Sequence, residues 1–105
     1  MQRVTLVRYK TKPERADENE ALSKAVFAEL RQTHPDHVAY GLFRDGSDFV
    51  HLFVNAKADD SSAVTELASF KAFTSDINAR CEAPPETTRL ALNLIESYGL
   101  TKARA

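Results

Sequence analysis

The chain has 105 residues and a mass of 11.7 kDa, which is the size of one domain. Its 43% of hydrophobic residues exclude a disordered chain, and its 14 basic and 15 acidic side chains nearly cancel, unlike those of nucleic-acid binders or basic membrane-surface proteins. The single cysteine excludes an internal disulfide. The stretch MQRVTLVRYK lacks the apolar region of a signal peptide, and no apolar run reaches the length of a membrane helix. We therefore expect a cytoplasmic protein with no membrane or nucleic-acid partner.

The first half of the chain predicts a strand followed by a helix. QRVTLVRYK, residues 2–10, is rich in β-branched and aromatic residues. The next residues, TKPE, have the form of a capping box in which Thr11 and Glu14 bond reciprocally to the backbone. Apolar side chains then recur at helical spacing, and Pro35 ends the helix near His34.

The second half predicts a hairpin, a helix and a last strand. HVAYGLFR and DFVHLFVNA are joined by Asp45-Gly46-Ser47, which is a hairpin signal. After a polar loop, apolar residues recur at spacings of three and four from Leu67 to Cys81, and two prolines follow. TTRLALNLI, residues 87–95, alternates as a strand does. The order β-α-β-β-α-β predicts a ferredoxin-like α+β domain over residues 1–97, with an antiparallel sheet, both helices on one face and a C-terminal tail over 98–105.

The alternation along the strands predicts two faces of the sheet, and both are apolar. We assign the wholly apolar face to the helices: Val4, Leu6, Val50, Leu52, Val54, Leu90, Leu92 and Leu94. The other face then contains Thr5, Val7, Tyr9, Phe49, His51, Phe53, Asn55, Arg89, Ala91, Asn93 and Ile95. Such a patch is larger than a monomer usually exposes, so we expect a homodimer in which a second copy covers the face with His51.

The strand over residues 38–44 has two possible faces, because a slip of one residue reverses every side chain. A two-residue hairpin loop would place Tyr40 and Leu42 beside His51, whereas a three-residue loop would place Gly41 and Phe43 there. We favour the three-residue loop, which keeps Leu42 with the helices and places Ala39 and Gly41 on the face with His51, since small residues beside large aromatic ones leave room for a cavity.

The stretches VTLVRYKTKPER, YGLFRDGSDFVHLFV and LASFKAF, within residues 1 to about 97, resemble the dimeric α/β-barrel superfamily, and within it the antibiotic-biosynthesis-monooxygenase-like (ABM-like) proteins. The resemblance implies a homodimer whose two sheets close into a barrel. It also implies a small pocket, either within the barrel or between sheet and helices. Oxygenases of this family act on phenolic or quinol compounds without metal or flavin, and a related branch degrades haem.

The chain departs from the family at positions that carry its chemistry. It contains no tryptophan, and Asn55 occupies the place of the tryptophan that lines the family's site. Phe53 stands where members often have a glutamate, and the first strand lacks the asparagine of the haem-degrading branch. The resemblance therefore implies the fold, and leaves open whether the protein is an enzyme.

His51 is the candidate catalytic residue, with Tyr9, Phe49, Phe53, Asn55 and Asn93 as candidate pocket residues. A neutral imidazole in an apolar pocket could act as a base or as a hydrogen-bond donor to a small aromatic ligand. The alternative is a structural histidine that is hydrogen-bonded across a dimer interface, or to Asn93 or Tyr9. His34, Asp36 and His37 do not have the spacing of a metal site, so we expect neither metal nor cofactor. Two functions follow: a cofactor-independent monooxygenase, or a non-catalytic dimeric module that binds a ligand or a protein.

Overall fold

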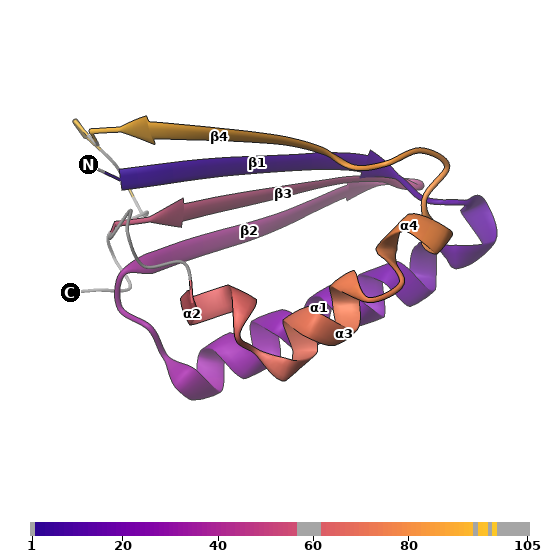
Figure 1. Ribbon diagram of the computed structural model, residues 1–105, viewed down its shortest axis with the longest axis horizontal. Helices are drawn as coiled ribbons and strands as arrows, with labels where there is room; N and C mark the ends of the chain where they lie inside the picture. Colours follow the sequence, from indigo (N-terminus) through magenta and orange to yellow (C-terminus); the bar gives the residue numbers. More distant parts are fainter. Residues whose placement is uncertain (1, 57–61, 94, 97, 99–105) are drawn as a thin grey trace.

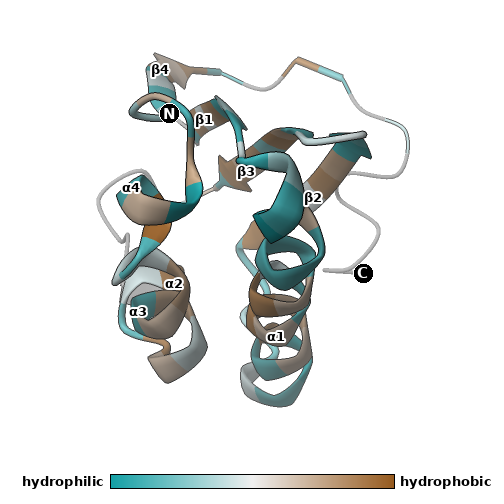
Figure 2. Cartoon of the chain, turned by 90° about the vertical axis from the view of Figure 1, so that its right-hand side faces the viewer, coloured by the Kyte–Doolittle hydropathy of each residue, from teal (hydrophilic) through white to brown (hydrophobic). Residues whose placement is uncertain are grey.

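The computed structural model describes residues 2–56, 62–93, 95, 96 and 98. Strands β1 (Gln2–Lys10), β2 (Val38–Asp45), β3 (Asp48–Asn55) and β4 (Glu86–Leu92) form one antiparallel sheet in the order β2-β3-β1-β4. A 3-10 turn, η1 (Pro13–Arg15), leads into helix α1 (Ala16–Thr33), and three short helices follow: α2 (Ser62–Thr65), α3 (Ala68–Thr74) and α4 (Ile77–Arg80). Figures 1 and 2 show the helices on one side of the sheet.

The predicted ferredoxin-like fold is confirmed, with differences at the ends of the elements. The second predicted helix is divided into α2, α3 and α4, and the last strand ends at Leu92. Thr11 forms no capping box, because it is fully buried and pairs with Cys81 in an isolated β-bridge. Most of the predicted C-terminal tail, and Leu94, lie outside the described residues. None of the helices in the described ranges combines the length and hydropathy that a membrane-spanning helix requires.

The assignment of the two sheet faces was wrong: they are exchanged. Phe49 and His51, 1% and 4% exposed, lie in the core against the helices. The side chains of Phe43, Leu90 and Leu92 are 58%, 50% and 47% exposed on the opposite side. We call this side the open face; its central apolar residues are Val4, Leu6, Val50, Leu52, Val54, Leu90 and Leu92. No second copy is needed to cover His51, because the chain's own helices cover it.

The polar residues of α1 explain the exchange. Asn19 and Ser23 point inward from α1 and are 0% and 1% exposed. A buried amide costs free energy unless it is hydrogen-bonded. The face with Tyr9 and His51 offers such partners, whereas the all-apolar face offers none. The helices therefore pack on the more polar of the two faces.

The three-residue hairpin loop was a wrong prediction, so Gly41 and Phe43 do not share a face with His51, although Leu42 does face the helices as expected. Leu42 is paired with His51 and Tyr40 with Phe53, so Tyr40 and Leu42 face the helices. The loop contains two residues, Gly46 and Ser47, since Asp45 still pairs with Asp48. Gly46 has φ 63° at the first loop position, as a type II′ hairpin turn requires, and glycine adopts that φ without steric cost.

Candidate functional site

His51 lies in the core between two tyrosine hydroxyls. Its Nε2 atom is 2.6 Å from the hydroxyl oxygen of Tyr9, and its Nδ1 atom is 2.9 Å from that of Tyr40. The strand register produces this arrangement, because β1 and β2 flank β3 and both tyrosines point to the helix side. Both ring nitrogens are therefore engaged by side chains far from His51 in sequence.

A chain of hydrogen bonds continues from Tyr9 to a buried arginine. The side-chain amide of Asn19 donates from Nδ2 to the Tyr9 hydroxyl at 2.8 Å, and its Oδ1 accepts from Nε of Arg80 at 3.0 Å. Arg80 is fully buried and also donates from Nη2 to the carbonyl oxygen of Phe73 at 2.6 Å. Its Nη1 atom is buried without a hydrogen-bond partner in the described part of the chain.

Arg80 fixes the direction of every hydrogen bond in this chain. Arginine has donors only, so the oxygen of the Asn19 amide must face it and the NH₂ group must face Tyr9. Tyr9 accepts that bond and directs its own proton to Nε2 of His51. A neutral imidazole then carries its proton on Nδ1 and donates to Tyr40. The hydroxyl proton of Tyr40 is consequently not used in this series of hydrogen bonds, and Tyr40 can donate it to another group.

Tyr9, Tyr40 and His51 are neutral at pH 7, and burial further disfavours the charged form of each. Desolvation lowers the pKa of His51 to about 4. Desolvation also raises the pKa of Tyr9 to about 12, although the hydrogen bond from Asn19 acts in the opposite direction. The pKa of Tyr40 is raised, first by burial and then by the proximity of Tyr9. His51 is therefore a neutral link between the two phenols.

Next to His51 and Tyr40 lies a cavity of about 260 Å³ between the sheet and the helices. We call it the His51 cavity. It is lined by Arg3, Thr5, Val7, Tyr40, His51, Phe53, Asn55, Val64, Thr65, Phe70 and Arg89. Its volume is close to the lower end of the range for small-molecule sites, about 300 Å³. An apolar lining with a few convergent polar groups is typical of such sites.

The structure brings some of the predicted site residues together and separates others. Phe53 and Asn55 line the His51 cavity with His51 itself. Tyr9 and Phe49 lie in the core and do not line the cavity, and their rings are stacked at a centroid distance of 5.5 Å. Asn93 follows the end of β4, is exposed, and is not among the residues that line the cavity.

The residues that were not among the predicted site residues include Tyr40, Asn19, Arg80, Arg3 and Arg89. For Asn19, a signal was present, since a polar residue four positions before Ser23 interrupts the buried stripe of a helix. Tyr40 was missed through the wrong hairpin loop. Arg80 precedes Cys81 at the end of a helix, where a basic residue usually indicates a solvated helix end.

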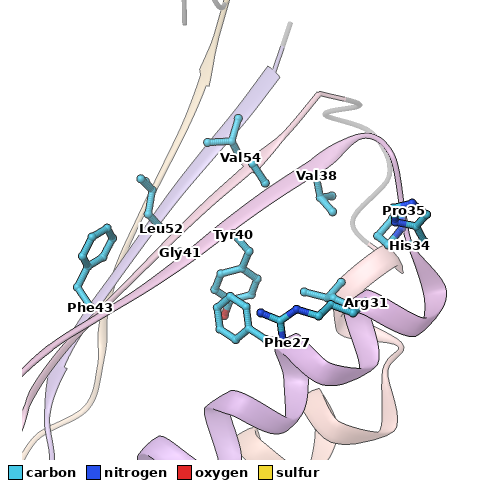
Figure 3. A pocket seen from close by; sticks show the side chains of 12 residues that line it. Phe27, Arg31, His34, Pro35, Val38, Tyr40, Gly41, Phe43, Leu52 and Val54 are labelled. Carbon is cyan, nitrogen blue, oxygen red and sulfur yellow. The ribbon is translucent and has the colours of Figure 1, made fainter. Parts of the chain in front are cut away.

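A larger cavity, of about 480 Å³, wraps around the free edge of β2. Figure 3 shows Phe43, Leu52 and Val54 on one side of the strands and Tyr40 with Phe27 on the other. Besides Tyr40, which also borders the His51 cavity, the titratable residues among its lining are His34 and Arg31, at the end of α1. No cluster of polar groups comparable to that of His51 lines it, so we take the His51 cavity as the candidate functional site.

No family model matches the chain, and no curated protein is similar to it in sequence. Solved structures are similar in fold. Rv0793 from Mycobacterium tuberculosis superposes with a TM-score of 0.78 at 16% identity, over 92% of this chain and 100% of that one. A provisionally assigned antibiotic biosynthesis monooxygenase from Bacteroides thetaiotaomicron gives 0.76 at 18% identity, over 94% and 95%. Another, from Caulobacter crescentus, gives 0.73 at 20% identity, over 88% and 91%.

These likenesses show that the chain has the ferredoxin-like fold of the ABM-like proteins. The resemblance inferred from the sequence is thereby confirmed at the level of the fold. Identities of 16–20% carry no activity from those proteins to this one.

Proposed function

We propose that the protein binds a small aromatic compound in the His51 cavity and acts on a phenolic or quinol substrate as a cofactor-independent oxygenase. The observation that carries the proposal is the neutral His51 held between Tyr9 and Tyr40 beside an apolar cavity. The likeness in fold to provisionally assigned monooxygenases supports the reaction class.

The direction of the hydrogen bonds favours a donor role for this site over a basic one. His51 donates to Tyr40, so Tyr40 can donate its proton to an oxygen atom of the ligand. A hydrogen bond of this kind stabilises a phenolate more than the neutral phenol, because the charge on the oxygen is larger. A quinol bound as its anion is more electron-rich and reduces oxygen more readily. In this mechanism His51 is a positioning residue, and Tyr40 contacts the substrate.

Oxygen uptake with a panel of quinols tests the proposal in the wild type, His51→Ala and Tyr40→Phe. The loss of one hydrogen bond to the reacting oxygen is expected to lower kcat/KM about tenfold in Tyr40→Phe. Tyr98→Phe is the matched control, because the side chain of Tyr98 is fully exposed. Equal rates in the wild type and both site variants would remove His51 and Tyr40 from catalysis.

The second candidate function is a non-catalytic ligand-binding module. It is favoured by the absence of tryptophan and by Phe53 and Asn55 at positions where the resembling oxygenases carry other residues. This function predicts that quinols bind in the His51 cavity without oxygen uptake. Titration calorimetry with the same quinols, under air and under nitrogen, distinguishes the two functions.

We further propose that the protein is a homodimer in which the open faces of two chains pack together. A continuous apolar surface with side chains such as Leu90 half exposed is larger than single chains usually leave in water. Covering it would contribute several kcal/mol at about 25 cal/mol per Å². The resemblance to dimeric α/β barrels supports a second copy as the partner.

A further inference from the structure

The His51 cavity has two basic residues in its lining and no acidic one. Arg3 in β1 and Arg89 in β4 both border it. Within the described ranges neither forms an ion pair, whereas Arg15 contacts Glu18 and Asp76, and Arg44 contacts Asp17 and Glu20. Arg15 and Arg44 are thus neutralised by carboxylates of the chain, whereas no carboxylate in the described ranges pairs with Arg3 or Arg89.

The strand register places these two arginines on the same face and close together. Arg3 pairs with Ala91 and Thr5 with Arg89, so Arg3 and Arg89 are diagonal neighbours across β1 and β4. Diagonal neighbours have Cα atoms about 7–8 Å apart, within reach of long side chains. Two positive charges so placed repel each other unless an anion lies between them. A planar carboxylate fits this role, because guanidinium groups bind it through paired hydrogen bonds.

Uncharged polar side chains also line the cavity: Thr5, Asn55, Thr65 and Tyr40. Among them, the Tyr40 hydroxyl has a proton that the hydrogen-bond chain leaves available. The aromatic side chains of Phe53 and Phe70 form part of the lining. The cavity therefore offers cations, an apolar wall, and neutral polar groups that include the Tyr40 hydroxyl as a donor.

From this arrangement we infer that the ligand is a small aromatic carboxylic acid that carries a phenol or carbonyl oxygen. Its carboxylate binds Arg3 and Arg89, its ring packs on Phe53 and Phe70, and its second oxygen accepts from Tyr40. This inference rests on the proposed ligand-binding role of the His51 cavity and narrows its substrate class. It requires no catalysis.

Titration calorimetry with 4-hydroxybenzoate and with its neutral analogue 4-hydroxybenzamide tests the inference. We expect the acid to bind at least tenfold more tightly than the amide at pH 7 and low salt. The preference should disappear in the Arg3→Gln/Arg89→Gln double variant. Arg31→Gln is the matched control, because Arg31 is exposed on α1 and does not line this cavity. Tyr40→Phe should weaken the binding of acid and amide by the same factor.

Equal affinities for acid and amide, no effect of the arginine substitutions, or failure of both probes to bind at millimolar concentration would overturn the inference. The double variant is expected to fold, since its substitutions remove no ion pair of the described chain. Its far-ultraviolet circular dichroism should match that of the wild type. Binding of the acid without uptake of oxygen would support this inference and contradict the proposed oxygenase, so the two fail separately.

Discussion

The free energy of unfolding is expected to fall by about 2 kcal/mol when the pH is lowered from 7 to 5, because His51 is buried as a neutral imidazole. Its pKa is lowered from 6.5 to about 4 in the folded protein. Between these two values the unfolded chain binds a proton that the folded chain does not bind. The contribution of neutral His51 to the free energy of unfolding is therefore fully present above pH 6.5, and it is lost as the pH falls toward 4.

Urea unfolding at pH 7 and pH 5, at one protein concentration, measures this loss. In His51→Gln the decrease should be smaller by about 2 kcal/mol, because glutamine does not titrate. The carboxyl groups with lowered pKa values, Glu18, Glu20 and Glu29, titrate below their ordinary value of 4.5 and change little in this interval. An equal decrease in His51→Gln and the wild type would show that His51 is not the buried neutral group described above.

The fold was predictable from the sequence because it depends on periodicities that are local. Alternation identified the strands, and Gly46 and Pro35 marked the turns that separate the elements. The identity of the covered face was not predictable by the same means. Alternation separates two faces without stating which one meets the helices, and here the more apolar face is the open one. Counting apolar residues gave the wrong face, because polar side chains can be buried when they are hydrogen-bonded. Here Tyr9 is hydrogen-bonded to both His51 and Asn19.

The site was only partly predictable, since its polar chain joins residues from three separated parts of the sequence. His51 was identifiable as a polar residue between two phenylalanines. Its partner Tyr40 depended on one residue of hairpin register, which periodicity does not determine. Arg80 lies 61 positions from Asn19, and only the packed structure places the two in contact.

The donor-to-acceptor direction of the hydrogen-bond chain is a consequence of the long-range contact between Arg80 and Asn19. A donor-only side chain at one end sets the tautomer of His51 and, through it, the role of Tyr40. Replacing Arg80 would therefore act on the cavity from a distance, without altering any residue that lines it.

Substitution of Leu52 by glutamate is expected to convert the proposed homodimer into a folded monomer. Leu52 pairs with Leu6 on the two central strands of the sheet, so it lies near the middle of the open face. A carboxylate in a packed interface has no partner there, and an uncompensated buried charge costs about 3–5 kcal/mol, or more than a hundredfold in the dissociation constant. In a single chain the same side chain can reach water from the half-buried position of Leu52.

Light scattering after size-exclusion chromatography measures the change in mass. The wild type should have twice the chain mass of 11.7 kDa, whereas Leu52→Glu should have the mass of one chain. Ala72→Glu, which places the same charge on the exposed side of α3, should remain dimeric. If the Leu52→Glu variant is folded, its free energy of unfolding should fall between pH 7 and pH 5 by the same amount as that of the wild type. The reason is that His51 lies on the opposite side of β3 and stays buried. A monomeric wild type, or a Leu52→Glu variant that stays dimeric, would mean that the open face does not join two copies of the chain.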